Sequence, residues 1–354
     1  MTATGALAGL RVAVADTMDD DVVSALRAAH AVIVGTVAPT RSGRVVADGG
    51  AEIAVTPDAP AVAVCVTPTA AALPCRLSVV ASDLALADLA MTVLAANAPA
   101  RAWPADVRFA APPDPVVGVA VDGCSRAVLN AVTAALSAAG ARVVAVEFDE
   151  AGMHTVPDGL DVVITPVGQT VAGGLCGVTV DIDGSVLDVL ARAFDDAIAM
   201  DIAALLTDGQ ARQHVWPLSA ADPVELVVFG AHLRGGPLTH QLTDLGSRWA
   251  GEITTAPRYR MTVLPTVPAK PAITRVPDGA PGTALYGHRW LMSAAALGRF
   301  LAALPAPMQL GKVEFDDGTW RTAFGCDAAA ATGTDISAYG SWPTAVAAGA
   351  APSA

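Results

Sequence analysis

Apolar positions in the first part of the chain follow two alternating patterns, short continuous runs and helical spacing. Leu10 to Val14 predicts a strand, Asp19 to Ala29 predicts a helix whose acidic first turn complements the helix dipole, and Ala31 to Gly35 predicts a second, buried strand. Such strand–helix–strand units predict helices packed on a mainly parallel sheet.

The same order returns between residues 116 and 148. Val116 to Val121 predicts a strand, and Leu129, Val132 and Leu136 lie on one face of a predicted helix that ends at Gly140. Further strands are predicted at 142–148 and 160–165 and a helix at 82–95, while residues 61–66 form a short apolar run in a segment with little pattern. The first part of the chain is therefore expected to form an α/β domain.

Two segments rich in proline and glycine, 98–115 and 207–223, interrupt these patterns. The second contains Gly209, Pro217 and Pro223 and is taken as the domain boundary. The expected organisation is a first domain at 1–206, a linker at 207–223, a second domain at 224–346 and a disordered tail at 347–354.

Short strands dominate after the linker. They are predicted at 224–229, 259–264, 283–290, 311–315 and 320–325, with one helix at about 293–304. The link from Asp316 to Thr319 contains Asp-Gly and predicts a hairpin between the last two strands. We expect a small, barrel-like β domain with a packed helix.

Composition narrows the class of protein. The 354 residues are 53% hydrophobic and 16% charged, with a net charge of −13, which disfavours binding to nucleic acid. An uninterrupted apolar run of about 18 residues is missing from the sequence, so no membrane span is expected. The first residues lack a basic segment, which argues against a signal peptide and predicts a cytoplasmic protein.

The five cysteines are scattered and form no C-x-x-C pair. Neither a disulfide framework nor a structural zinc site is expected, and the sequence indicates no metal and no cofactor.

The segment from Phe229 to Leu242 carries the strongest chemical signal. A predicted strand runs into a turn rich in glycine and proline that bears His232, Arg234 and His240. Imidazole titrates near neutral pH and guanidinium binds carboxylates, so this turn is a candidate for binding or protonating a small anion. The alternative is a solvated turn whose histidines cap or pack.

Seven segments after the linker resemble, in the same order, the C-terminal domain of the allophanate hydrolase family. They are Gly230–Leu242, Thr255–Arg260, Pro268–Pro271, Leu297–Phe300, Pro305–Pro307, Gly311–Gly318 and Ile336–Trp342. The resemblance implies a γ-glutamylcyclotransferase-like β-barrel, whose Tyr-Gly-Ser-Leu loop is similar to Phe229–Leu233. It also implies decarboxylation of N-carboxyurea.

The front half resembles, in reduced form, the amidase-signature domain of the same family, an α/β/α sheet domain. Leu7 to Asp19 is similar to that family's segment around its catalytic lysine, but Ala15 stands at the lysine position. The Gly/Ser-rich stretch is reduced to Ser42-Gly43, and the segment expected to hold the nucleophile, Val55–Ala61, has no serine. Since a Ser–Ser–Lys triad needs the lysine to move protons, loss of amide hydrolysis is expected.

The resemblance gives roles to residues of the second domain. His240 is the first candidate for proton donor and His232 the second, with Gly230, Arg234 and Gln241 binding the substrate.

Three further residues are candidates for the same pocket. Arg258 and Tyr259, just before a strand, are candidates for substrate binding, with turn hydrogen bonding as the alternative. The family strand that usually carries glutamates has Tyr286 and His288 instead, so His288 is a third candidate proton carrier or a packed residue.

Three functions stay open at this point. The chain acts on a small carbamate or ureido substrate, or it is a non-catalytic subunit that pairs with a separate amidase or with itself, or it binds ureido or γ-glutamyl-like metabolites. The three functions differ in the roles that they require of the histidines.

Overall fold

The structure is a computed structural model that describes residues 5–38, 42–57, 64–69, 77–96, 107–147, 156–167, 175–207 and 223–352. The chain divides into two compact units, Met1–Asp222 and Pro223–Ala354. Most of the expected linker, 208–222, lies outside the described residues, as does part of the segment 55–61.

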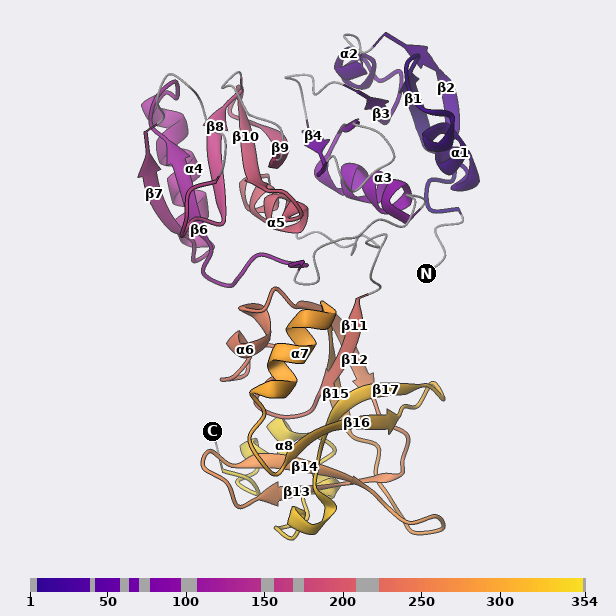
Figure 1. Ribbon diagram of the computed structural model, residues 1–354, viewed down its shortest axis with the longest axis vertical. Coiled ribbons are helices and arrows are strands. Elements are labelled where there is room, and N and C mark those ends of the chain that lie inside the picture. Colours follow the sequence, from indigo (N-terminus) through magenta and orange to yellow (C-terminus); the bar gives the residue numbers. More distant parts are fainter. Residues whose placement is uncertain are drawn as a thin grey trace. The chain divides into compact units, whose positions relative to one another are not determined.

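The first unit is built on a ten-stranded sheet with the order β2-β1-β3-β5-β4-β9-β10-β8-β6-β7 (Figure 1). The strands are β1 Arg11–Ala15, β2 Val32–Val37, β3 Ile53–Thr56, β4 Val64–Thr67, β5 Ser78–Ala81, β6 Val116–Ala120, β7 Arg142–Val146, β8 Val162–Pro166, β9 Leu175–Ile182 and β10 Ser185–Arg192. The helices are α1 Asp20–Ala28, α2 Ser42–Ala47, α3 Leu84–Ala96, α4 Arg126–Ala138 and α5 Asp196–Leu206.

The sheet is mixed, so the prediction of a mainly parallel sheet is wrong. Parallel pairing is confined to β1 with β2 and β3 and to β6 with β7 and β8, the two predicted strand–helix–strand units. Antiparallel pairs join these units through β5, β4, β9 and β10. The tight turn at Asp183 and Gly184, with φ of 52° and 79°, makes β9 and β10 a hairpin that needs no crossover helix.

The strand expected to be buried at 31–35 is an edge strand. β2 pairs only with β1, and Val32 and Val34 are 48% and 44% exposed. An apolar run therefore predicted the strand correctly but not its place in the sheet.

Helix α4 illustrates how the core of this unit forms. Ser125 caps its start by accepting a hydrogen bond from the N–H of Val128, and Gly140 follows its end with a φ of 88°. Its buried side chains are Val128, Val132 and Leu136. The predicted face is therefore displaced slightly, since Leu129 is only partly buried.

The second unit has a five-stranded sheet, in the order β12-β15-β11-β17-β16, and a separate two-stranded ladder of β13 and β14. Its strands are β11 Val224–Val228, β12 Arg248–Thr254, β13 Tyr259–Leu264, β14 Lys270–Arg275, β15 Tyr286–Met292, β16 Met308–Glu314 and β17 Trp320–Cys326. The helices are α6 His240–Thr243, α7 Ala294–Ala302 and α8 Trp342–Ala347, with 3₁₀ turns η3 Ala328–Ala330 and η4 Ser337–Tyr339.

The expected barrel is not closed within residues 223–352. β12 and β16 are the two ends of the five-stranded order, and the isolated bridge between Thr255 and Phe315 lies just beyond them. This unit has its own core, which includes Phe229, Trp290 and Phe315.

A disordered tail was expected from residue 347 onward. The described residues after α8, up to 352, instead pack on this core. The N–H groups of Ala350 and Ala351 donate to the carbonyl of Ala345, and Ala351 is 5% exposed. A small residue can be buried here because these hydrogen bonds satisfy its backbone.

Candidate active-site cavity

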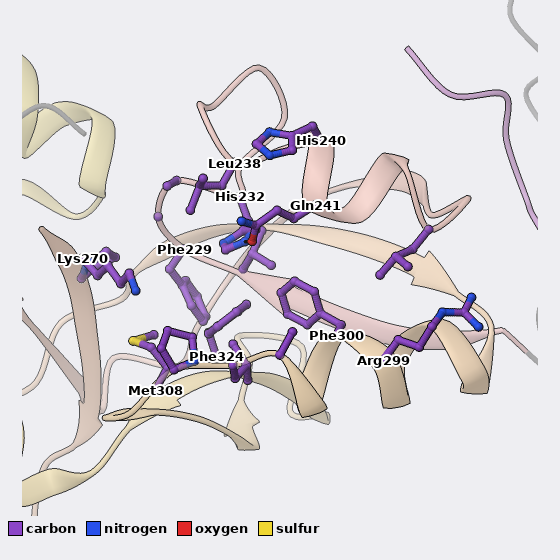
Figure 2. Close-up of a pocket in the computed structure, with 18 of the residues that line it drawn as sticks. Phe229, His232, Leu238, His240, Gln241, Lys270, Arg299, Phe300, Met308 and Phe324 are labelled. Atoms are coloured by element: carbon purple, nitrogen blue, oxygen red, sulfur yellow. Dashed lines mark hydrogen bonds between the residues drawn. The ribbon is translucent and has the colours of Figure 1, made fainter. Parts of the chain in front are cut away.

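A cavity of about 580 Å³ opens where β11 ends, between α6, the end of α7 and the start of β14 (Figure 2). The polar side chains that line it are His232, His240, Gln241, Asp244, Lys270 and Arg299. The apolar side chains include Phe229, Leu245, Ile273, Phe300, Leu304, Met308 and Phe324. This volume and mixture are typical of sites for small molecules.

His232 lies in the aromatic wall of the cavity. Its ring stacks on Phe324, with centroids 5.3 Å apart, and meets Phe300 edge to face at 5.4 Å. Its Nε2 is 2.9 Å from Oε1 of Gln241. Burial lowers the pKa of His232, and the positive charge of Lys270 lowers it further, so His232 is neutral at pH 7.

With Oε1 of Gln241 as acceptor, the neutral imidazole of His232 carries its proton on Nε2. Its Nδ1 then offers a lone pair. His232 is therefore suited to orient a substrate or to accept a hydrogen bond rather than to supply a proton.

His240 is the first residue of α6 and is exposed at the rim of the cavity. Its Nδ1 is 3.1 Å from the carbonyl oxygen of Pro237. Because a carbonyl only accepts hydrogen bonds, Nδ1 is the donor of this bond and carries a proton. This fixed tautomer suits His240 for proton transfer at a defined atom.

Gly230 lies at the start of the turn that carries these histidines. A Cβ at this position would lie 2.6 Å from Cδ and Cγ of Pro271, so the end of β11 approaches β14 too closely for any side chain. The N–H of Leu233 donates to the carbonyl of Gly230 and closes the turn.

Sequence reasoning missed two cationic residues of the cavity, Lys270 and Arg299. Within the described part of the chain, no ion pair joins either to an acidic side chain. Both lie in segments that carry the family resemblance, Pro268–Pro271 and Leu297–Phe300. That resemblance was the only signal that marked them, because neither lies near the histidines in sequence.

His288 and Arg234 do not line the cavity but form a second cluster beside the turn. Nδ1 of His288 accepts a hydrogen bond from the backbone N–H of Arg234 at 2.9 Å, and its Nε2 is 2.8 Å from the hydroxyl of Tyr286. The guanidinium of Arg234 lies 4.4 Å from the ring centroid of Trp249. His288 therefore holds the turn instead of facing the cavity.

Arg258 and Tyr259 lie in another part of the unit. The hydroxyl of Tyr259, which is 3% exposed, accepts a hydrogen bond from the N–H of Glu314 at 2.7 Å. Arg258 approaches Asp278 at 3.4 Å. Of the eight candidate residues, the cavity brings together Gly230, His232, His240 and Gln241.

The described residues contain no group of three or more His, Cys, Asp or Glu side chains arranged to hold a metal ion. Among the helices that the structure describes, none has the length and apolarity needed to cross a membrane.

The fold of the whole chain is that of allophanate hydrolases. The crystal structure of Kluyveromyces lactis allophanate hydrolase superposes with a TM-score of 0.71 at 18% identity, covering 97% of this chain and 89% of that one. The K. lactis urea amidolyase structure gives a TM-score of 0.73 at 18% identity, covering 97% of this chain and 33% of that one.

Residues 224–347 match the allophanate hydrolase C-terminal domain family. Urea amidolyase of Lachancea kluyveri is 34% identical over 128 residues, which are 35% of this chain and 7% of that protein. Urea amidolyase of Saccharomyces cerevisiae is 32% identical over 122 residues, 33% of this chain and 7% of that protein. The matches therefore span a small part of these relatives. The second unit is therefore similar in sequence to the allophanate hydrolase C-terminal domain, and the chain is similar in fold to allophanate hydrolase structures.

Proposed function

We propose that the second unit decarboxylates N-carboxyurea, or a similar small carbamate, as a step of urea nitrogen metabolism. The observation that carries this proposal is the cavity lined by His232, His240, Gln241 and Lys270, a lysine that no described acidic side chain pairs with. A carbamate brings a carboxylate that a lysine binds and a nitrogen that must receive a proton, and the cavity offers a group for each.

The reaction breaks the bond between the carboxylate carbon and the nitrogen. The electron pair of that bond goes to the nitrogen, which takes a proton, and carbon dioxide leaves. We assign the proton to Nε2 of His240, because its Nδ1 is tied to the carbonyl of Pro237. Gln241 and His232 orient the substrate, and the aromatic wall of Phe300 and Phe324 favours the neutral product over the carboxylate.

We further propose that the first unit has lost amide hydrolysis and that, where the substrate is a similar small carbamate, a separate amidase supplies it: hydrolysis of the amide of allophanate releases ammonia and leaves a nitrogen that bears two carboxylates. Ala15 ends β1 and is 3% exposed, so a methyl group occupies the place where the resemblance puts the proton-transferring lysine. We also propose that the fold of the second unit is γ-glutamylcyclotransferase-like. Its five-stranded sheet would then be a barrel of that type that is not closed.

Measuring carbon dioxide and urea release tests this function. N-carboxyurea is supplied as its salt, allophanate, and the full chain is added. We expect acceleration over the uncatalysed reaction, and we expect the variant His240→Ala to lose about two to four orders of magnitude of it.

Thr243→Ala, on the same short helix but outside the cavity lining, is the matched control and retains activity. Equal rates for wild type and His240→Ala would exclude this role. Binding of a carbamate analogue without any acceleration would instead favour the metabolite-binding function.

A further inference from the structure

The cavity is large for the substrate of the proposed function. N-carboxyurea has seven non-hydrogen atoms, each smaller than the roughly 30 Å³ that a water molecule takes in the liquid, so it fills at most about a third of the space. The cavity measures about 580 Å³, a size typical of ligands several times larger. Most of its wall would face no ligand atom if N-carboxyurea were the natural substrate.

The wall of the cavity carries charged side chains toward its two ends and apolar side chains between them. Lys270 and Arg299 lie toward opposite ends, and Phe229, Phe324 and Phe300 lie between them (Figure 2). The charge of Lys270 acts on His232, which places this lysine on the side of the imidazole. The apolar lining residues nearest to Arg299 in sequence are Phe300, in α7, and Ala303 and Leu304, which follow that helix.

We propose that the ligand of this cavity is a carbamate or ureido carboxylate that bears an apolar substituent. Its carboxylate lies toward Lys270, and its substituent lies against Phe300 and Leu304. This inference rests on the proposed function for the carbamate end of the ligand and adds the substituent. An apolar substituent would explain the continuous apolar wall of this open site. Apolar side chains that stay in contact with water contribute no favourable burial free energy unless a ligand covers them.

The end of α7 offers a matched pair of substitutions. Ala302 and Ala303 are both exposed, but only Ala303 lines the cavity. Ala303→Trp therefore fills the space assigned to the substituent, whereas Ala302→Trp adds the same ring outside it. Neither residue belongs to the group of polar side chains that would handle the carboxylate.

Stable ureido carboxylates serve as probes in calorimetric titration of the full chain. N-carbamoylglycine has no apolar substituent, whereas N-carbamoylalanine, N-carbamoylleucine and N-carbamoylphenylalanine carry increasing apolar area. We expect the dissociation constant to fall about fourfold for each methylene buried. Ala303→Trp should remove this gain and leave the affinity for N-carbamoylglycine within about twofold, while Ala302→Trp leaves the whole series unchanged.

The outcomes separate this inference from the proposed function. If affinity does not rise along the series, or rises equally in Ala303→Trp, the substituent is wrong, even where N-carboxyurea is still decarboxylated. Lys270→Ala should weaken all four probes by a similar factor, because it removes the partner of the carboxylate. A variant Lys270→Ala that binds the series as wild type does would overturn the orientation proposed here.

Discussion

Nδ1 of His288 accepts a hydrogen bond from the backbone N–H of Arg234 at 2.9 Å. Accepting that bond requires an unprotonated Nδ1, so Nε2 carries the proton and lies 2.8 Å from the hydroxyl of Tyr286. The bond joins β15 to the turn that leads from His232 to His240. A side chain outside the cavity thus depends on its neutral form to hold the residues inside it.

This dependence predicts that the second unit loses stability as the solution is acidified. Burial lowers the pKa of His288 below its ordinary value, while the charge of Glu252 raises it in part and that of Arg234 lowers it again. The unfolded chain therefore takes up this proton first as pH falls below about 6.5. The contribution of His288 is complete above that pH and declines as pH falls toward the lowered pKa.

Urea unfolding of wild type and His288→Asn at several pH values between 5 and 8 measures this contribution. Asn places an oxygen near Nδ1 that still accepts from Arg234 but does not titrate, so its unfolding free energy should vary less over this range. His288→Leu removes the acceptor and should cost about 1 to 3 kcal/mol at pH 7.5. An unchanged pH dependence in His288→Asn would assign the acid sensitivity to His232 or other groups.

Gln241 controls the protonation of His232. Gln241→Glu places a carboxylate 2.9 Å from Nε2 in place of the amide oxygen, and an opposite charge at that distance favours the imidazolium. We expect the pKa of His232, which burial now lowers, to rise, as followed by NMR titration of the ring protons. The pKa of His288 is the internal reference and should not move.

Gly230 has a steric reason to be glycine. Gly230→Ala brings a methyl group to 2.6 Å from the ring of Pro271, and we expect a loss of about 1 to 3 kcal/mol in the free energy of unfolding. Gly298→Ala is the matched control, because it lies in α7 with nothing within 4 Å and should stabilise the helix by up to about 1 kcal/mol. Equal effects of the two substitutions would contradict the steric explanation.

The burial of Asp196 predicts the opposite pH dependence for the stability of the first unit. Its carboxylate accepts hydrogen bonds from the N–H and hydroxyl of Thr69, at 2.7 Å and 2.6 Å, but burial raises its pKa. The unfolded chain loses this proton at lower pH than the folded unit, so the stabilisation is complete at low pH and declines as pH rises through the raised pKa.

Asp196→Asn keeps the shape of the side chain without the charge. We expect its stability relative to wild type to improve as pH rises from about 4 to 8, measured by unfolding monitored on a probe in the first unit. Asp158→Asn, on an exposed turn, is the control and should follow wild type. A difference between Asp196→Asn and wild type that stays constant over this range would show that burial does not disfavour the ionised form.

Local patterns predicted several elements of the second unit because the deciding interactions are near in sequence. The strand Tyr259–Leu264 is bounded by turn residues, and Ser293 caps α7 by accepting from the N–H of Ala296. The hairpin of β16 and β17 follows from the Asp-Gly link between Glu314 and Trp320.

The two strands of the second unit that were missed, β12 and β14, each have a local feature that argues against a strand. Gly251, with a φ of 108°, interrupts β12 where its register against β15 shifts. Pro271 stands inside β14, where the lack of an N–H is tolerated because β14 pairs only with β13.

Local patterns were enough to predict the two strand–helix–strand units, the break before residue 224 and the turn that carries His232 and His240, since periodicity, proline and glycine act over a few residues. Contacts between distant segments bring Lys270 and Arg299 to that turn, let His288 support it from outside and place Arg258 and Tyr259 elsewhere. These outcomes depend on which strands become neighbours in the sheet. Hydrophobic patterning indicates that a segment forms a strand, but pairing between distant segments decides where that strand lies and which side chains face one cavity.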